Sequence, residues 1–92
     1  MHYVTEATYV SKYQIKVRFE NNEIKLVDLE SHLHGPVFEP LKDLSFFKEF
    51  IVNTDIDTVT WPNAADFSPD FLYEIGCLIS EQQDQATAKS RG

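Results

Sequence analysis

Two segments near the start of the chain alternate regularly between apolar and polar residues. In the first, residues 13–20, the apolar members are Tyr13, Ile15, Val17 and Phe19. Alternation with a period of two, rich in β-branched and aromatic residues, is typical of a half-buried strand. The pattern resumes over residues 23–29 after Asn21-Asn22, and Asn tolerates the left-handed conformation that a two-residue turn requires. We therefore predict a β-hairpin.

A two-residue turn also fixes which residues face each other in this hairpin. It places Phe19 opposite Ile24. Two positions further along each strand, Val17 then faces Leu26, so we expect all four side chains on the face that meets the core. Upstream, residues 3–10 are rich in Val, Thr and Tyr and predict a third strand. The chain is thus expected to begin as an antiparallel meander of three strands.

Helical spacing follows an irregular connection over residues 29–40, which is long enough to be either functional or partly helical. Asp43 is a good N-cap for a helix. The apolar stripe that comes after it comprises Leu44, Phe46, Phe47, Phe50 and Ile51. Residues 56–61 then predict a short strand, which Pro62 ends because it has no N–H to donate to a neighbouring strand.

The start of a last helix is marked by a capping sequence. Ser68 is the predicted N-cap, Pro69 occupies the first helical position, and Phe67 can pack against Leu72 across the cap. The predicted apolar stripe of this helix comprises Phe71, Leu72, Ile75, Leu78 and Ile79. Cys77 lies beside that stripe, where a buried structural thiol is the expected role.

These elements predict a single α+β domain over residues 1–80, since a second core would need roughly 50 residues of its own. The expected order is β-β-β-α-β-α. A small antiparallel sheet, made of the N-terminal three-strand meander plus one later strand, is packed by two helices. Residues 81–92 are mostly polar and are predicted to form a frayed or disordered tail.

The charge balance narrows the classes of partner. Asp and Glu number 15 against 8 Lys and Arg, which gives a net charge of −7. Such a field opposes binding to nucleic acid, which depends on neutralising phosphates with cations. No apolar run is long enough to cross a membrane, and the start of the chain lacks the pattern of a signal peptide. With a single Cys and hence no intrachain disulfide, a cytoplasmic protein is expected.

Motifs for catalysis are missing, so no catalytic residue and no cofactor is assigned. The chain has three Gly and no phosphate-binding loop, and its single Cys excludes paired-Cys zinc sites. One metal-like pair exists, His32 and His34, with carboxylates of neighbouring residues as further candidate ligands. It supports an alternative function as a small metal-binding protein or metal-assisted hydrolase. The competing interpretation is two solvent-exposed loop histidines.

A second candidate site is the corner after the short strand, where Trp61, Asn63 and Asp66 lie within six positions. Pro62 and the cap at Ser68 account for most of this segment as a turn between strand and helix. Asn63 and Asp66 are polar residues that capping does not require. We therefore take Trp61, Asn63 and Asp66 as the candidate binding corner for a small molecule.

Aromatic residues make up 13% of the chain, and most are expected in the core. Phe46, Phe47 and Phe50 form a face on the predicted helix that is wider than a core of this size needs. The surplus predicts a surface for a protein partner or for a homodimer.

The order of several of these motifs resembles one protein family. The residues that carry the resemblance run from the Tyr13-x-Ile15-x-Val17-x-Phe19 strand through Val27-Asp28-Leu29, Phe38-x-Pro40-Leu41-x-Asp43 and Phe46-Phe47 to Thr58-Val59-x-Trp61-Pro62-Asn63-x-x-Asp66 and Pro69-x-x-Leu72-Tyr73. This pattern resembles family 2442 of the bacterial domains of unknown function, whose fold is named for the amino-terminal domain of a Nitrosomonas protein. The resemblance covers residues 4–76.

The resemblance implies a small α+β fold with no established activity or catalytic residues. Some relatives continue into a helix-turn-helix domain, and members look like one partner in toxin–antitoxin pairs. The chain departs from the family at Ala64, where Gly is usual, and a turn that needs a positive φ is strained there. Our leading hypothesis is a non-enzymatic interaction or regulatory protein, in the form of an acidic, antitoxin-like partner in a two-protein module.

Overall fold

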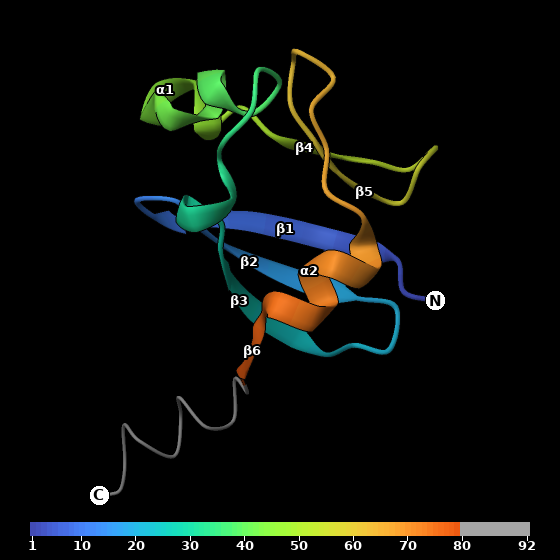
Figure 1. Ribbon diagram of the computed structural model, residues 1–92. Coiled ribbons are helices and arrows are strands. Elements are labelled where there is room, and N and C mark those ends of the chain that lie inside the picture. Colours follow the sequence, from blue (N-terminus) through green and yellow to red (C-terminus); the bar gives the residue numbers. More distant parts are fainter. Residues whose placement is uncertain (80–92) are drawn as a thin grey trace, which may run out of the picture.

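The computed structural model describes residues 1–79 and confirms the α+β class (Figure 1). Its main element is a four-stranded antiparallel sheet of order β1-β2-β3-β6, and β4 and β5 form a second, two-stranded sheet. The strands are β1 (Val4–Ser11), β2 (Gln14–Phe19), β3 (Ile24–Asp28), β4 (Ile51–Asn53), β5 (Thr58–Thr60) and β6 (Cys77–Ile79). The helices are α1 (Leu44–Phe47) and α2 (Pro69–Ile75), with the short 3₁₀ helices η1 (Glu30–His32) and η2 (Glu39–Lys42) in the long connection. The predicted polar tail, residues 81–92, lies outside the described residues.

The N-terminal meander is confirmed, with β1 antiparallel to β2 and β2 antiparallel to β3. The register between β1 and β2 shifts at two places, between Val4 and Glu6 and between Tyr9 and Ser11. Each shift inserts a residue without a partner and reverses the inward–outward alternation. These bulges are the reason that β1 alternates poorly in sequence.

The turn of the β2–β3 hairpin is one residue longer than predicted. The N–H of Phe19 donates to the carbonyl oxygen of Glu23 at 2.9 Å, so the turn comprises residues 20–22. Asn22 adopts a φ of 68°. A three-residue turn that ends in a left-handed residue is a common alternative to the two-residue turn, and its sequence signal is nearly the same.

This extra residue makes the predicted pairing wrong by one position. Ile24 faces Arg18, and Leu26 faces Lys16. Because successive side chains in a strand point to opposite faces, a shift of one residue moves the whole set. Ile24 and Leu26 therefore lie on the outer face of the sheet, while Val27 takes the core position opposite Ile15.

The first predicted helix is shorter than its apolar stripe suggested. The side chain of Asp43 accepts a hydrogen bond from the N–H of Ser45 at 3.1 Å, which confirms the N-cap, but α1 has a single turn. The chain then becomes β4, where Ile51 pairs with Thr60 and is 62% exposed. Ile51 and Val52 are both β-branched and therefore favour a strand, so pairing with β5 overrides the helical spacing.

The last helix begins as predicted and ends earlier. Ser68 caps α2 by accepting from the N–H of Phe71 at 3.1 Å, yet Gly76 is extended with φ −74° and ψ 153°. Cys77 is therefore an exposed residue of an edge strand rather than a buried residue of a helix. The strand that completes the main sheet is β6, whereas the predicted strand at 56–61 pairs with β4.

Gly76 allows this close approach to β3. A Cβ at this position would lie 2.8 Å from the Cβ of Lys25, closer than real side-chain contacts. The absence of a side chain therefore lets the chain leave α2 and pair with the edge of β3.

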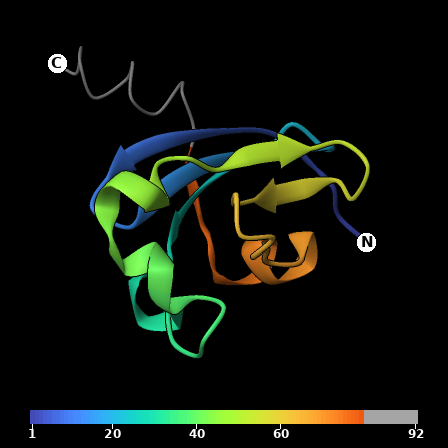
Figure 2. The same cartoon turned by 90° about the horizontal axis from the view of Figure 1, so that it is seen from above.

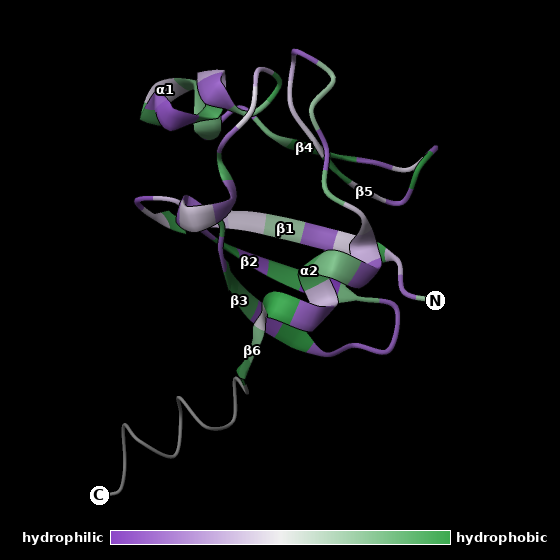
Figure 3. Ribbon diagram, in the orientation of Figure 1, coloured by the Kyte–Doolittle hydropathy of each residue, from purple (hydrophilic) through white to green (hydrophobic). Residues whose placement is uncertain are grey.

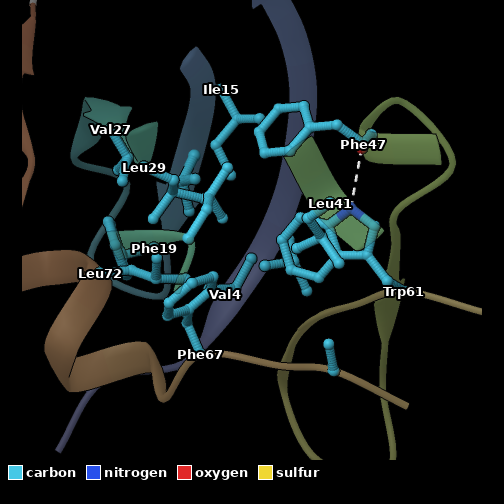
Figure 4. Packing of buried hydrophobic residues seen from close by; sticks show 14 residues of the cluster. Val4, Ile15, Phe19, Val27, Leu29, Leu41, Phe47, Trp61, Phe67 and Leu72 are labelled. Carbon is cyan, nitrogen blue, oxygen red and sulfur yellow. Dashed lines mark hydrogen bonds between the residues drawn. The ribbon is translucent and has the colours of Figure 1, made fainter. Parts of the chain in front are cut away.

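A single core fills the space above one face of the four-stranded sheet. Figure 2 shows the helices and the β4–β5 hairpin gathered on that side. The residues at the centre of the core are 0% exposed and come from both halves of the chain: Ile15, Val17, Phe19, Val27, Leu29, Leu41, Phe47, Val59 and Leu72. Figure 4 shows the packing of this core and labels Ile15, Phe19, Val27, Leu29, Leu41, Phe47 and Leu72 among its residues.

Candidate functional site

The candidate binding corner is built around a tryptophan that belongs to the core. Trp61 is 3% exposed, and its indole N–H donates to the carbonyl oxygen of Phe47 at 2.8 Å (Figure 4). Its ring lies 5.7 Å from that of Phe47 and 5.9 Å from that of Phe67, between centroids. A buried indole needs a partner for its N–H, and this one has it within the fold. Trp61 is thus a structural residue that joins α1 to the corner.

Asn63 also has a structural role. Its side-chain N–H donates to the carbonyl oxygen of Val37 at 2.9 Å, and its side-chain oxygen accepts from the N–H of Ala65 at 3.2 Å. The residue therefore ties the corner to the turn before η2. Asp66 forms a backbone bridge to Thr60 while its side chain is exposed. The structure brings Trp61 and Asp66 together only as parts of one turn, with Trp61 buried and Asp66 facing solvent.

Ala64 takes the strained conformation that a glycine would relieve. Its φ is 70°, and its N–H donates to the carbonyl oxygen of Trp61 at 2.9 Å. A left-handed conformation costs a non-glycine residue about 1–2 kcal/mol. The turn thus keeps a positive φ despite the alanine.

The predicted aromatic partner surface is wrong at its centre. Phe47 is 0% exposed, and Phe46 and Phe50 are half-buried against the core. Because α1 is only one turn long, these residues do not form the columns of a helix. The ring of Phe50 instead packs 5.9 Å from that of Trp61, so it helps to close the core.

His32 and His34 are not joined by further ligands. The ring of His32 packs edge-on against Phe71, with 5.1 Å between centroids. Within residues 1–79, no three His, Cys, Asp or Glu side chains gather in a way that would hold a metal ion. The structure offers no specific observation in favour of the metal alternative.

A cluster that the sequence did not predict ties the start of the chain to α2. The ring of His2 stacks on that of Tyr73, with 3.7 Å between centroids and 13° between planes. The Lys25 ammonium lies 3.6 Å from the centroid of the same Tyr73 ring and donates to the Tyr73 carbonyl oxygen at 2.7 Å. We call His2, Glu20, Glu23, Lys25 and Tyr73 the N-terminal clasp.

Two carboxylates complete the clasp. Glu20 accepts from the N–H of Tyr3 at 2.8 Å and lies 3.0 Å from the His2 ring nitrogen Nδ1, and the Tyr3 contact is the main reason that the pKa of Glu20 is lowered. The hydroxyl of Tyr73 donates to Glu23. This bond lowers the pKa of Glu23 and raises the pKa of Tyr73, because it stabilises the carboxylate and the protonated phenol. Residues up to 71 positions apart build the clasp, so no local pattern reveals it.

Next to the clasp lies a hollow of about 340 Å³, which we call the N-terminal groove. Its lining residues come from the chain start, the β4–β5 turn and the start of α2: Met1, His2, Tyr3, Asp55, Ile56, Asp57, Ser68, Pro69 and Asp70. The backbone N–H of His2 donates to the Asp70 carboxylate at 2.7 Å and so fixes one wall of the groove.

No other helix or strand of residues 1–79 packs on the outer face of the four-stranded sheet (Figure 2). The outward-facing residues of its β3–β6 half are Ile24, Leu26, Cys77 and Ile79, which we call the outer apolar strip. Strand β6 has the colour of hydrophobic residues in Figure 3. The β1–β2 half of this face is polar, with an ion pair between Arg18 Nε and Glu6 Oε1 at 3.3 Å. The one-residue shift in the hairpin creates the β3 part of this strip, which is why the sequence did not predict it.

Comparisons with known proteins give a family and no function. None of the helices in residues 1–79 has the length and apolar character needed to cross a membrane. No curated protein and no solved structure matches the chain. Residues 4–76, which include every element from β1 to α2, match the family described as Protein of unknown function (DUF2442). The chain therefore belongs to the DUF2442 family.

Proposed function

We propose that this protein is a non-enzymatic interaction protein that binds another protein through the outer face of its sheet. The observation that supports this proposal is the outer apolar strip, which no element of residues 1–79 covers. An antiparallel sheet with one solvated face normally carries polar residues there. Within this strip Cys77 is exposed, Leu26 and Ile79 are partly exposed, and Ile24 is 9% exposed. Exposed apolar residues that gather on one sheet face are typical of a contact surface.

The strip has the composition of an interface centre with a polar rim. Leu26 lies between Lys16 on β2 and Cys77 on β6, and Ile24 lies between Arg18 and Ile79. Protein interfaces are depleted of charge at the centre and carry charged groups at the edge. The face therefore suits a protein contact better than a small-molecule site.

The net charge of −7 favours a basic partner, because opposite charges speed the encounter of two proteins. We propose on this basis the role of an acidic, antitoxin-like subunit in a small two-protein module. Its single cysteine is consistent with function in the cytoplasm. A homodimer through the same face is the other form that this proposal can take.

The test is affinity capture of a tagged copy from its native host, combined with one variant on the strip. We expect one protein to be retained in near-stoichiometric amount, or a dimer in light scattering, and Leu26→Asp to abolish either. Leu44→Asp is the matched control, since Leu44 is 39% exposed and lies outside the sheet. Circular dichroism verifies that both variants fold. Absence of any partner or dimer, or retention of binding by folded Leu26→Asp, would count against the proposal.

A further inference from the structure

The N-terminal groove gathers three segments that are distant in sequence. Tyr3 comes from the chain start, Ile56 from the β4–β5 turn and Pro69 from the first turn of α2. Hydrogen bonds hold the segments together. The N–H of Val4 donates to the carbonyl oxygen of Asp57 at 2.9 Å, and the N–H of His2 donates to Asp70. The hollow is thus held in place by the fold.

The groove concentrates exposed apolar side chains. Of the eight large hydrophobic residues that the described chain exposes, three line it: Met1 at 91%, Tyr3 at 44% and Ile56 at 46%. Single exposed hydrophobic residues need no explanation, but their convergence on one concave surface does. Together with Pro69 they form an apolar lining.

The charged side chains around this lining are mainly acidic, and the Met1 amino group is a cationic group beside them. Asp55, Asp57 and Asp70 are its carboxylates, and no Lys or Arg is among the lining residues. His2 is the one basic side chain, and its ring is engaged by Tyr73 and Glu20. Acidic groups around a concave surface attract cations and repel anions, so they determine which ligand can enter.

We propose that the N-terminal groove is a docking site for a segment of a protein partner that presents an apolar side chain beside Lys or Arg. The apolar lining takes the apolar side chain, and Asp55 and Asp57 take the cation. This inference rests on the proposed function, because it requires a protein partner. It adds a second contact, separate from the outer apolar strip, and it states the chemistry of the segment bound there.

The first experiment maps a probe peptide onto the ¹⁵N-labelled full chain by NMR. The probe is the acetylated and amidated peptide Gly-Lys-Leu-Arg-Gly, compared with Gly-Glu-Leu-Glu-Gly. We expect the basic peptide to shift the amide signals of Tyr3, Ile56 and Asp57 until the shifts saturate. Its affinity should fall as the salt concentration is raised. The acidic peptide leaves these signals unchanged. No shift with the basic peptide, or equal shifts with both, would overturn the proposal.

Variants then assign the two parts of the site. Asp55→Asn combined with Asp57→Asn is expected to lower the affinity for the basic peptide about fivefold, because two exposed ion pairs are lost. Asn tolerates the left-handed conformation of Asp57, whose φ is 59°, so the fold is kept. Ile56→Ser is expected to lower the affinity for the same peptide, because it removes the apolar contact. Glu49→Gln and Val37→Ser, at exposed residues outside the groove, are the matched controls and leave the affinity unchanged.

The outcome is separable from that of the proposed function. Leu26→Asp removes the outer apolar strip and leaves the peptide shifts at the groove intact. If host capture fails while the peptide shifts persist, the proposed function falls and the groove remains a cationic-peptide site. If capture succeeds and the groove variants change neither peptide binding nor capture, the groove proposal is wrong.

Discussion

The two faces of the four-stranded sheet are made from alternate residues of the same strands, yet only one of them packs against the core. On the inner face, Ile15, Val17 and Phe19 are 0% exposed and meet the helices and the second sheet. On the outer face, Lys16 and Leu26 stand opposite each other with no described element above them. The comparison shows that hydrophobicity did not decide burial here. The register did, because it determined which apolar residues of β3 point toward the core.

Truncation at the centre of the inner face gives the largest expected effect. Phe19→Ala removes a ring at 0% exposure and is expected to lower the free energy of unfolding by about 3–5 kcal/mol. Leu26→Ala on the outer face should lower it by less, by about 1 kcal/mol, since this side chain is already partly exposed and lies outside the core. Urea unfolding measures both. Similar losses for the two variants would mean that the outer face is covered.

The close approach of the chain at Gly76 to β3 can be tested by adding a side chain there. Gly76→Ala places a Cβ 2.8 Å from that of Lys25, and overpacking of this kind costs about 1–3 kcal/mol. We expect lower stability and faster amide exchange in β6, because the added methyl pushes this strand from β3. Exchange that stays unchanged at Leu78 and Ile79 would contradict this role of the glycine. Thr54→Ala, at an exposed residue of the β4–β5 turn, checks for non-specific effects.

The corner above the inner face should become more stable when its strain is removed. Ala64→Gly relieves a φ of 70° and is expected to raise the free energy of unfolding by about 1 kcal/mol, with part offset by the greater freedom of the unfolded chain. Thermal unfolding measures the change. A loss of stability would show that the alanine methyl contributes more by packing than its backbone costs.

The smallest effect concerns the N-terminal clasp at the edge of the inner face. The pKa values of Glu20 and Glu23 are lowered in the folded state, so the stability they add is present above their usual value of 4.5. It is lost as the pH falls through the folded-state values. Tyr73→Phe removes the hydroxyl that bonds Glu23, so the pKa of Glu23 should rise and part of this acid-dependent loss should disappear.

The alkaline side of this dependence has the opposite origin. The raised pKa of Tyr73 means that its contribution is present below a pH of 10 and is lost above it, and Tyr73→Phe abolishes that loss. NMR titration of the carboxyl carbons of Glu20 and Glu23 checks the assignments. An unchanged titration of Glu23 in the variant would exclude the hydroxyl as the cause.

The features that sequence predicted well are those set by near neighbours. The caps at Asp43 and Ser68 need only an N–H two or three positions away, and both are present. The stop at Pro62 follows from its missing N–H. The strand β2 follows from local alternation, and β1 follows from its content of Val, Thr and Tyr. At Ala64 the positive φ was expected from the residue type that the family uses at this turn, and the structure has it.

The candidate sites were predicted less well, because each depended on what a residue meets in space. Trp61 and Asn63 were candidates for a binding corner, but partners at Phe47 and Val37 engage them. The aromatic surface was wrong because the chain leaves α1 after one turn. The N-terminal groove and the clasp join segments that are far apart in sequence.

The sequence by itself determined the class of fold, the starts of both α-helices, the end of β5 before Pro62, and the acidic net charge. Most of these features depend on backbone groups and side chains within a few residues of each other, so they need no contact with a distant segment. Only the tertiary structure decided the register of β3, the conversion of Ile51 and Cys77 into strand residues, and the surfaces left open. Those outcomes depend on competition between distant segments for the same hydrogen bonds and the same core. A local sequence pattern cannot predict how that competition ends.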